Sequence, residues 1–238
     1  MAGPAAEDPA ASDPDDPTDV RSGDVVTGDG SPVAVYLALP FGEAPEIIHG
    51  AVRPRGSILE LGCGAGRITR PLIGLGHPVV AVDDSPAMLA HVTGAETVCA
   101  DVFTLDLGRT FDGVVGGSHL IDEPEQARRL TLLEICRRHV ADDGVVLLER
   151  YEPEWVRAPA DSQGTSGPVE IEFRVVAHHG TTFDATVTYQ LGDRRWTQPF
   201  TAAAVDDDEL ARNAAACGLV LDGWLDDRHT WARLRPTP

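Results

Sequence analysis

The sequence ILELGCGAGR at residues 58–67 determines how this chain folds. Its apolar start indicates a buried strand at residues 57–61, and three glycines at alternate positions follow directly. Glycine allows a tight turn and leaves space where a side chain would collide with a ligand. The helix expected next begins with backbone N–H groups that have no partner within it. This arrangement is typical of the nucleotide-like ligand sites of α/β proteins.

The acid before the first glycine indicates which ligand suits the turn. The carboxylate of Glu60 would repel a phosphate and attract a cationic amino-acid group. A dinucleotide site needs the spacing G-x-G-x-x-G, and Arg67 stands where that third glycine would be. An NAD-dependent oxidoreductase is therefore the less favoured interpretation.

Length and composition indicate one α/β domain. The chain has 238 residues, of which 42% are hydrophobic, enough for a sizeable core. No apolar run approaches the roughly 20 residues of a membrane helix, and the first residues lack the layout of a signal peptide. We therefore expect no membrane association.

The cysteines predict neither a metal site nor disulfide bonds. They are scattered and form no Cys-x-x-Cys pair: Cys63, Cys99, Cys136 and Cys217. With no pair at metal-ligand spacing, we expect reduced thiols, no bound metal and a cytoplasmic location.

The charge balance excludes several partners. The formal net charge is −19, and all 19 basic residues are arginine. Nucleic-acid binding needs a basic footprint, which the chain as a whole lacks. Nucleic acid and anionic membranes are therefore not expected as partners.

Residues 1–30 are expected to form an acidic, disordered tail. They contain eight acidic residues and one arginine, with Pro, Ala, Ser and Gly between them. Such a segment buries too little apolar surface to offset the entropy of ordering. The folded domain is expected at residues 31–238.

From residue 31 to residue 150 the chain alternates between strands and helices. We expect strands at 57–61, 79–82, 97–100, 111–116 and 144–148, and helices at 43–52, 67–75 and 123–140. Ser85 and Pro86 suit the cap and first turn of a further helix. Continuous apolar strands separated by helices predict a doubly wound, Rossmann-like parallel sheet covered on both faces.

After residue 150 the pattern alternates between apolar and polar residues. Strands expected at 169–177, 182–191 and 194–200 would form an inserted antiparallel β-meander at about 165–201. A helix at 206–217 would precede a C-terminal antiparallel hairpin at 219–224 and 230–234. The expected fold class is α/β, mostly parallel, with this hairpin and the inserted meander.

The motif Glu-x-Gly-x-Gly-x-Gly resembles the first motif of class I S-adenosylmethionine-dependent methyltransferases. The resemblance covers residues 31–238 and is sharpest at 57–122. It implies S-adenosyl-L-methionine as cofactor and S-adenosyl-L-homocysteine as product. The implied loop around the methionine part of the cofactor comprises Glu60, Gly62, Cys63, Gly64 and Gly66, with Glu60 holding the ammonium group.

Further cofactor contacts follow from the same resemblance. A carboxylate after the second strand can accept hydrogen bonds from ribose hydroxyls, a need that NAD shares. Asp83 fits this role best, with Asp84 as the alternative. The other implied contacts are Met88, Asp101 and Val102 with the adenine, and Gly117 and Ser118 with the methionine part.

Two side chains are candidates for the site of methyl transfer. The resemblance places His119 opposite the transferable methyl group, where an imidazole could take a proton from a hydroxyl or amine. Tyr36 could cover the sulfonium with its ring. Packing in the interior is the alternative for both. Arg150, at the same rim, is a candidate for pairing with an acidic substrate group.

The sequence thus predicts methyl transfer to a small molecule, with oxygen or nitrogen acceptors favoured. No Asn-Pro-Pro-Tyr or Asp-Pro-Pro-Tyr follows the fourth strand, which argues against methylation of DNA bases or glutamine. The inserted meander resembles the substrate-covering sheets of small-molecule N-methyltransferases, and joining two subunits of a homodimer is its alternative role. A non-catalytic cofactor-binding or regulatory protein remains the alternative function.

Overall fold

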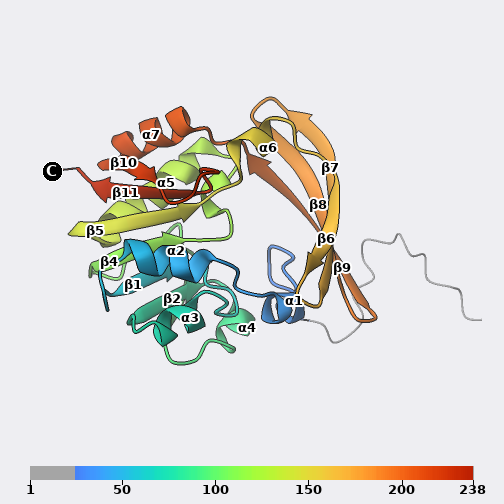
Figure 1. The fold of residues 1–238 in the computed structure, drawn as a ribbon, viewed down its shortest axis with the longest axis horizontal. Helices are drawn as coiled ribbons and strands as arrows, with labels where there is room; N and C mark the ends of the chain where they lie inside the picture. The colour runs from blue at the N-terminus through green and yellow to red at the C-terminus, as the bar shows by residue number, and fades with distance from the viewer. Residues whose placement is uncertain (1–24, 238) are drawn as a thin grey trace, which may run out of the picture.

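The computed structural model describes residues 25–237 and contains two sheets that face each other across a central space (Figure 1). The larger sheet has seven strands in the order β10-β11-β5-β4-β1-β2-β3. The smaller has four strands in the order β6-β7-β8-β9. The expected acidic tail falls mostly on residues 1–24, which lie outside the described residues.

Five parallel strands form the centre of the larger sheet: β1 (Ile58–Leu61), β2 (Val79–Asp83), β3 (Glu96–Cys99), β4 (Phe111–Gly116) and β5 (Val140–Glu149). β1 pairs with β2 on one side and with β4 on the other. All four residues of β1 are buried, because helices cover both faces of the sheet. The predicted parallel strands are confirmed, although β5 begins four residues earlier than expected.

Helices cover the sheet in two layers: α2 (Ala44–Ala51), α3 (Thr69–Gly74), α4 (Pro86–Leu89), α5 (Gln126–His139) and α7 (Asp207–Ala216). On one face, Leu132 of α5 and Leu210 of α7 pack against the strands. On the opposite face, Ile48 of α2 and Leu72 of α3 do the same. The predicted cap of α4 is confirmed, since the Ser85 hydroxyl accepts a hydrogen bond from the Met88 N–H.

The C-terminal hairpin of β10 (Leu219–Trp224) and β11 (Trp231–Pro236) completes the larger sheet. β11 pairs antiparallel with both β10 and β5, so the last strand lies between them. This confirms a parallel sheet that ends in an antiparallel hairpin.

The smaller sheet, called the cap sheet below, comprises β6 (Ser162–Ser166), β7 (Val169–His179), β8 (Thr182–Leu191) and β9 (Arg194–Ala203). The inserted meander is confirmed, but the expectation of three strands is wrong. The edge strand β6 has the sequence SQGTS and is almost entirely exposed, so it lacks the apolar alternation that identifies a strand. Three short helical segments were also not expected: α1 (Val33–Ala38), η1 (Leu120–Asp122) and α6 (Pro153–Arg157).

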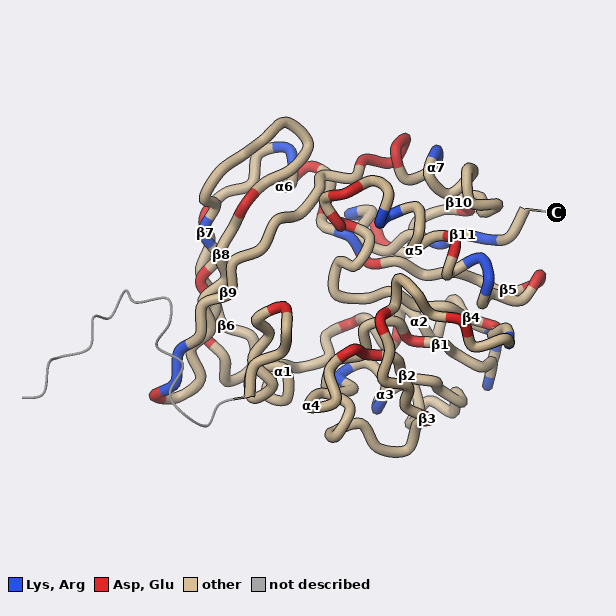
Figure 2. The backbone as a smooth tube through the Cα atoms, turned by 180° about the vertical axis from the view of Figure 1, so that it is seen from behind, with Lys and Arg blue, Asp and Glu red and all other residues tan. Residues whose placement is uncertain are grey.

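The start of the described chain joins the cap sheet to the larger sheet. Val35 of α1 packs against Val187 and Trp196 of the cap sheet. The Gln198 amide of β9 donates hydrogen bonds to the Asp29 carbonyl at 2.9 Å and to the Ser31 hydroxyl at 3.2 Å. Residues 25–30, expected to belong to the tail, are therefore part of the fold. Seen from behind, α1 lies between the two sheets (Figure 2).

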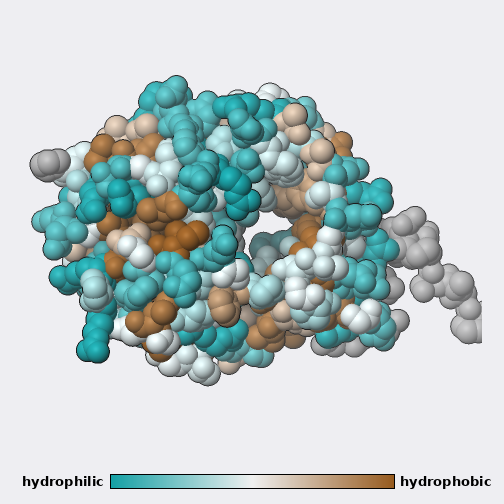
Figure 3. Space-filling view, viewed as in Figure 1, coloured by the Kyte–Doolittle hydropathy of each residue, from teal (hydrophilic) through white to brown (hydrophobic). Residues whose placement is uncertain are grey.

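The two sheets leave an opening between them. The space-filling view shows it as a hollow with apolar residues on its walls (Figure 3). The carboxyl ends of the parallel strands face this hollow, which is where ligands bind in open α/β sheets. None of the helices within residues 25–237 is long and apolar enough to cross a membrane.

Candidate functional site

A cavity of about 430 Å³ lies at the carboxyl ends of β1, β2 and β4. It is lined by every residue predicted to contact the cofactor except Gly66, namely Tyr36, Glu60, Gly62, Cys63, Gly64, Asp83, Asp84, Met88, Asp101, Val102, Gly117 and Ser118. Residues from five separate segments thus converge on one site, called the cofactor cavity below.

The glycine turn forms the floor of the cofactor cavity. Gly64 has a φ of 54°, in the left-handed region that favours glycine, and a Cβ atom added there would lie 3.9 Å from the Tyr36 ring. Tyr36 thus stands over the turn. Gly66 lies behind the cavity, where an added Cβ atom would come within 3.2 Å of Val92. Gly66 therefore contributes to the shape of the turn.

Glu60 is a buried acid that borders the cofactor cavity. Its side chain is 3% exposed, and its carboxylate accepts a hydrogen bond from the Thr69 hydroxyl at 2.6 Å. Desolvation by burial raises the pKa of Glu60 to about 7, although the Thr69 hydrogen bond and the Arg67 charge lower it. A cationic group bound in the cavity would stabilise the charged form of this carboxylate.

Asp83 connects the second strand to the glycine turn. One carboxylate oxygen accepts the Gly64 N–H at 2.8 Å, and the other accepts the Ser85 N–H at 2.9 Å. Partial burial raises the pKa of Asp83 more than these two hydrogen bonds lower it. Its carboxylate is thereby fixed at the edge of the cavity, where each oxygen keeps a lone pair for a ligand hydroxyl.

The remaining predicted residues form the two ends of the cavity. Met88 is buried against Val33 and Ala65, so its side chain forms an apolar surface. Asp84 and Asp101 lie exposed at the rim. Sequence reasoning missed Asp29, which lines the cavity from the N-terminal turn, because nothing in its local sequence separates it from the other acidic residues of the tail.

A second cavity of about 510 Å³ lies between the carboxyl end of β5 and the cap sheet. We call it the acceptor cavity. His119 lines it and directly follows Ser118, which lines the cofactor cavity. The two cavities therefore meet at the loop after β4. His119 lies on the acceptor-cavity side of this loop.

The backbone of this loop is strained. Ser118 and His119 have φ values of 53° and 64°, a region that costs non-glycine residues free energy. The Glu149 carboxylate holds the loop by accepting the Ser118 N–H at 2.7 Å. The His119 ring stacks on Tyr151 with a centroid separation of 3.9 Å and an interplanar angle of 7°. Such strain occurs preferentially at active sites, where neighbouring contacts maintain it.

Asp122 faces His119 from η1. Its side chain is 2% exposed, lies 3.6 Å from His119 Nδ1 and accepts the Tyr151 N–H at 2.8 Å. Burial lowers the pKa of His119, but the Asp122 and Glu149 carboxylates raise it more, so the net shift is upward. The Asp122 carboxylate thus lies beside the imidazole, and the Asp122 and Glu149 carboxylates together raise its pKa. Sequence reasoning identified His119 but missed Asp122, whose position depends on the left-handed backbone before it.

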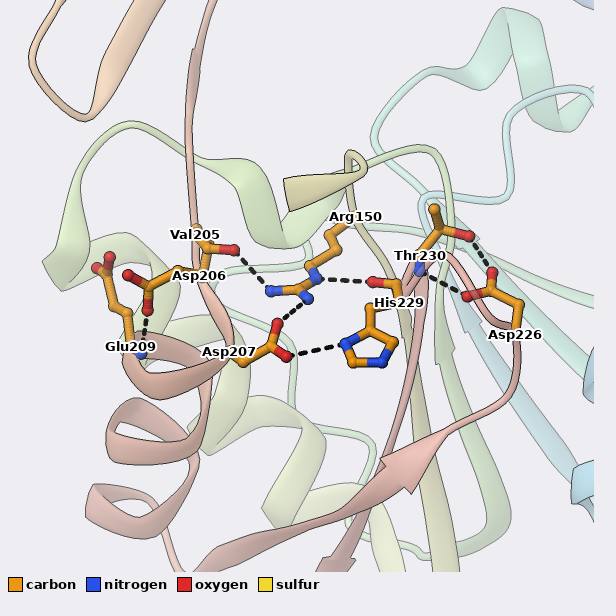
Figure 4. A network of polar contacts seen from close by, with 8 residues as sticks. All are labelled: Arg150, Val205, Asp206, Asp207, Glu209, Asp226, His229 and Thr230. Atoms are coloured by element: carbon orange, nitrogen blue, oxygen red, sulfur yellow. Dashed lines mark hydrogen bonds and ion pairs between the residues drawn. The ribbon is translucent and has the colours of Figure 1, made fainter. Parts of the chain in front are cut away.

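The expectation that Arg150 binds an acidic substrate group is wrong. Its side chain is 0% exposed and donates to the carbonyls of Val205 at 2.7 Å and His229 at 2.9 Å (Figure 4). It also pairs with Asp207 and lies 4.1 Å from the centroid of the Trp224 ring. Arg150 therefore joins β5 to the segments before α7 and β11. These partners are far from Arg150 in sequence, so the role could not be identified from the sequence.

No group of three or more His, Cys, Asp or Glu residues in the described part of the chain could hold a metal ion.

Comparisons with known proteins indicate which proteins the chain is similar to. Residues 58–144 match the family described as "Methyltransferase domain". The chain is similar to the cypemycin N-terminal methyltransferase of a Streptomyces species, with 31% identity over 121 residues that cover 48% of this chain and 49% of that protein. A shorter match of 65 residues, 37% identical, covers 24% of this chain and 24% of a Schizosaccharomyces pombe 18S rRNA (guanine-N(7))-methyltransferase. The chain thus spans about half of one curated relative and a quarter of the other.

Solved structures share the fold over almost the whole chain. An S-adenosylmethionine-dependent methyltransferase from Clostridium acetobutylicum has a TM-score of 0.70 at 13% identity, covering 86% of this chain and 95% of that chain. The sugar N-methyltransferase KedS8 of a Streptoalloteichus species has a TM-score of 0.67 at 18% identity, covering 100% and 99%. These matches confirm the Rossmann-like fold with its added sheet.

The buried position of Arg150 predicts a structural effect of its removal. Arg150→Ala leaves the carbonyls of Val205 and His229 without a donor, and the Asp207 carboxylate keeps only its contact with the His229 ring, so the free energy of unfolding should fall by about 1–3 kcal/mol. Urea denaturation measures this change. Arg212→Ala, at an exposed position on α7, is the control and should change stability by about 0.5 kcal/mol or less. Unchanged stability in Arg150→Ala would contradict the structural role.

Proposed function

We propose that the chain is an S-adenosylmethionine-dependent methyltransferase and that it methylates a small molecule held in the acceptor cavity. The match of residues 58–144 to a methyltransferase domain supports this proposal. The observation that carries this proposal is that two cavities meet at the loop after β4, where Ser118 lines one and His119 the other. One has the residues expected to hold the cofactor, and the other is closed by the cap sheet. Oxygen and nitrogen are the favoured acceptor atoms.

The residues of the cofactor cavity fit S-adenosylmethionine. Glu60 would hold its ammonium group, Asp83 its ribose hydroxyls and Met88 its adenine. Gly64 and Tyr36 both line the cavity, and a positive sulfur bound beside the Tyr36 ring would be attracted to its aromatic face. When bound, the cofactor supplies a methyl group on a positively charged sulfur. The protein then has to align the acceptor and exclude water.

We assign His119 the role of proton acceptor and Asp122 that of its positioning residue. A neutral imidazole takes the proton that a hydroxyl or ammonium acceptor must lose. The Asp122 carboxylate, 3.6 Å from Nδ1, favours the protonated imidazole that results. Since Nδ1 faces Asp122, Nε2 is the nitrogen left for the acceptor.

The cap sheet is proposed as the cover of the acceptor cavity. Phe173, Val187 and Phe200 of this sheet line that cavity, which supports a substrate-covering role over a homodimer contact. The four cysteines have free thiols, in keeping with a proposed cytoplasmic location. That the acceptor is a small molecule rather than a nucleic acid remains part of this proposal.

Transfer of a labelled methyl group tests the proposed function. Incubation with S-adenosylmethionine and fractionated small metabolites should yield a product heavier by one methylene together with S-adenosylhomocysteine, both followed by mass spectrometry. Cofactor binding without any product would favour a non-catalytic or regulatory protein. Formation of reduced nicotinamide from NAD would favour the oxidoreductase.

The His119–Asp122 pair predicts a characteristic pH dependence. His119 accepts a proton only when neutral, so kcat should rise with pH through its raised pKa. Asp122→Asn removes a charge that raises this pKa, so the midpoint should move to lower pH. His119→Ala should lower kcat by roughly 10²-fold while S-adenosylhomocysteine still binds. An unmoved midpoint in Asp122→Asn would contradict the assigned pairing.

The raised pKa of Glu60 predicts proton release on cofactor binding. A bound ammonium group favours the carboxylate, so its pKa falls below about 7 in the complex and affinity increases as pH rises from 5.5 to 7.0. Calorimetry with S-adenosylhomocysteine in two buffers of different ionisation enthalpy should detect proton release near pH 6. Glu60→Gln, which cannot titrate, should bind with little pH dependence. Release by the variant equal to that of the wild type would rule out Glu60 as its source.

A further inference from the structure

The acceptor cavity has an unusual concentration of aromatic side chains. Phe, Trp and Tyr number only 6, 4 and 3 in the whole chain, and five of them line this cavity. We call these five the aromatic wall: Tyr151, Trp155, Phe173, Tyr189 and Phe200. Neighbouring rings lie close, with centroid separations of 5.2 Å for Trp155–Phe173 and 5.9 Å for Phe173–Phe200. A flat apolar body fits such a wall, whereas a molecule covered with hydroxyl groups would lose hydrogen bonds to water.

The buried apolar side chains of the cap sheet lie on its inner face, and the exposed Val176 of β7 is an exception. On β8, Phe183, Val187 and Tyr189 are buried, while the alternating positions carry polar residues such as Thr188. The Thr188 hydroxyl bonds to that of Thr197 at 3.0 Å across the sheet. Only the face toward the cavity therefore offers an apolar surface, which points to a ligand rather than to a second sheet as its partner.

A carboxylate lines the acceptor cavity together with the aromatic wall and His119. Glu149 lines the acceptor cavity, and its Oε2 atom accepts the Ser118 N–H at 2.7 Å. No donor within residues 25–237 contacts its Oε1 atom. Glu149 therefore keeps a free acceptor beside the loop at which the two cavities meet. Arg150, the nearest buried cation, is already occupied by Asp207 and two carbonyls.

The surface beside the acceptor cavity has a net negative charge, although Arg157 and Arg228 are part of it. Glu152 and the exposed Arg228 line both the acceptor cavity and an adjacent hollow of about 530 Å³. That hollow is lined mostly by acids, including Asp208 and Asp227. The field of such a surface attracts cations toward the opening and repels anions.

We propose that the methyl acceptor is a protonated amine on a flat apolar body, with the body against the aromatic wall and the ammonium group on Glu149. This inference rests on the proposed function and specifies its substrate class. An ammonium group gains a charge-assisted hydrogen bond from Glu149 and attraction to the neighbouring rings, neither of which a hydroxyl or carboxylate obtains to the same extent.

The reaction step balances with the residues present. The ammonium group gives one proton to His119, which frees the nitrogen lone pair. The nitrogen forms a bond to the methyl carbon as the bond from that carbon to sulfur breaks, and the electron pair of the broken bond stays on sulfur. The products are a methylated ammonium, a neutral thioether and a protonated His119, which returns its proton to solvent.

Binding of matched probes tests the proposal. 2-Phenylethylamine, 2-phenylethanol and phenylacetate share one aromatic body, and glucosamine is an amine without it. Calorimetric titration of the full chain near neutral pH, with and without S-adenosylhomocysteine, should show 2-phenylethylamine binding at least about tenfold more tightly than each of the other three.

Two variants separate the contributions to this preference. Glu149→Gln keeps an acceptor for the Ser118 N–H but loses the charge, so the amine and alcohol should bind within about threefold of each other. Trp155→Ala should weaken all three aromatic probes and leave glucosamine unchanged. Glu170→Gln, at an exposed position on β7, is the matched control and should behave as the wild type.

Equal binding of the amine and the alcohol, no saturable binding of the amine, or an amine preference that survives in Glu149→Gln would each overturn the proposal. Tighter binding of glucosamine than of 2-phenylethylamine would overturn it in favour of a hydrophilic amine. The same titrations also measure cofactor binding. Failure to bind S-adenosylhomocysteine would contradict the proposed function. Normal binding of S-adenosylhomocysteine without a preference for the amine would contradict only the proposed acceptor class.

Discussion

The hydrogen bond from the Gly64 N–H to the Asp83 carboxylate holds the site together. It spans 2.8 Å and joins the turn after β1 to the end of β2, so both segments take fixed positions at the edge of the sheet. The same carboxylate accepts the Ser85 N–H and so fixes the start of α4, which places Met88. One side chain therefore sets the shape of the cofactor cavity, and glycine is needed because the turn has a left-handed backbone.

A second constraint acts at the loop after β4, where the cavities meet. Glu149 accepts the Ser118 N–H, and Asp122 accepts the Tyr151 N–H and lies 3.6 Å from His119 Nδ1. The cap sheet then closes the far side with aromatic rings. This arrangement joins a site suited to a positively charged cofactor with an apolar space that has a base and a carboxylate at its inner end. The chemistry of the site depends on how the cofactor and acceptor are positioned and on the exclusion of water, more than on any single reactive group.

Much of this fold could be predicted from the sequence, because local patterns indicate local structure. Strand β8 was predicted with its observed bounds since apolar and polar residues alternate regularly along it. Strand β6 was missed because its pairing with β7, and not its own composition, makes it a strand. Most of the residues of the cofactor cavity were predicted, since they follow strand ends. Arg150 was misinterpreted because its partners come from distant segments, which only tertiary structure brings together.

A crystal structure with S-adenosylhomocysteine tests the central claim most directly. The account predicts ligand density in the cofactor cavity, with the ribose hydroxyls on Asp83, the ammonium group near Glu60 and the thioether sulfur toward His119. Density at another place, or a ligand whose ribose does not contact Asp83, would contradict the account.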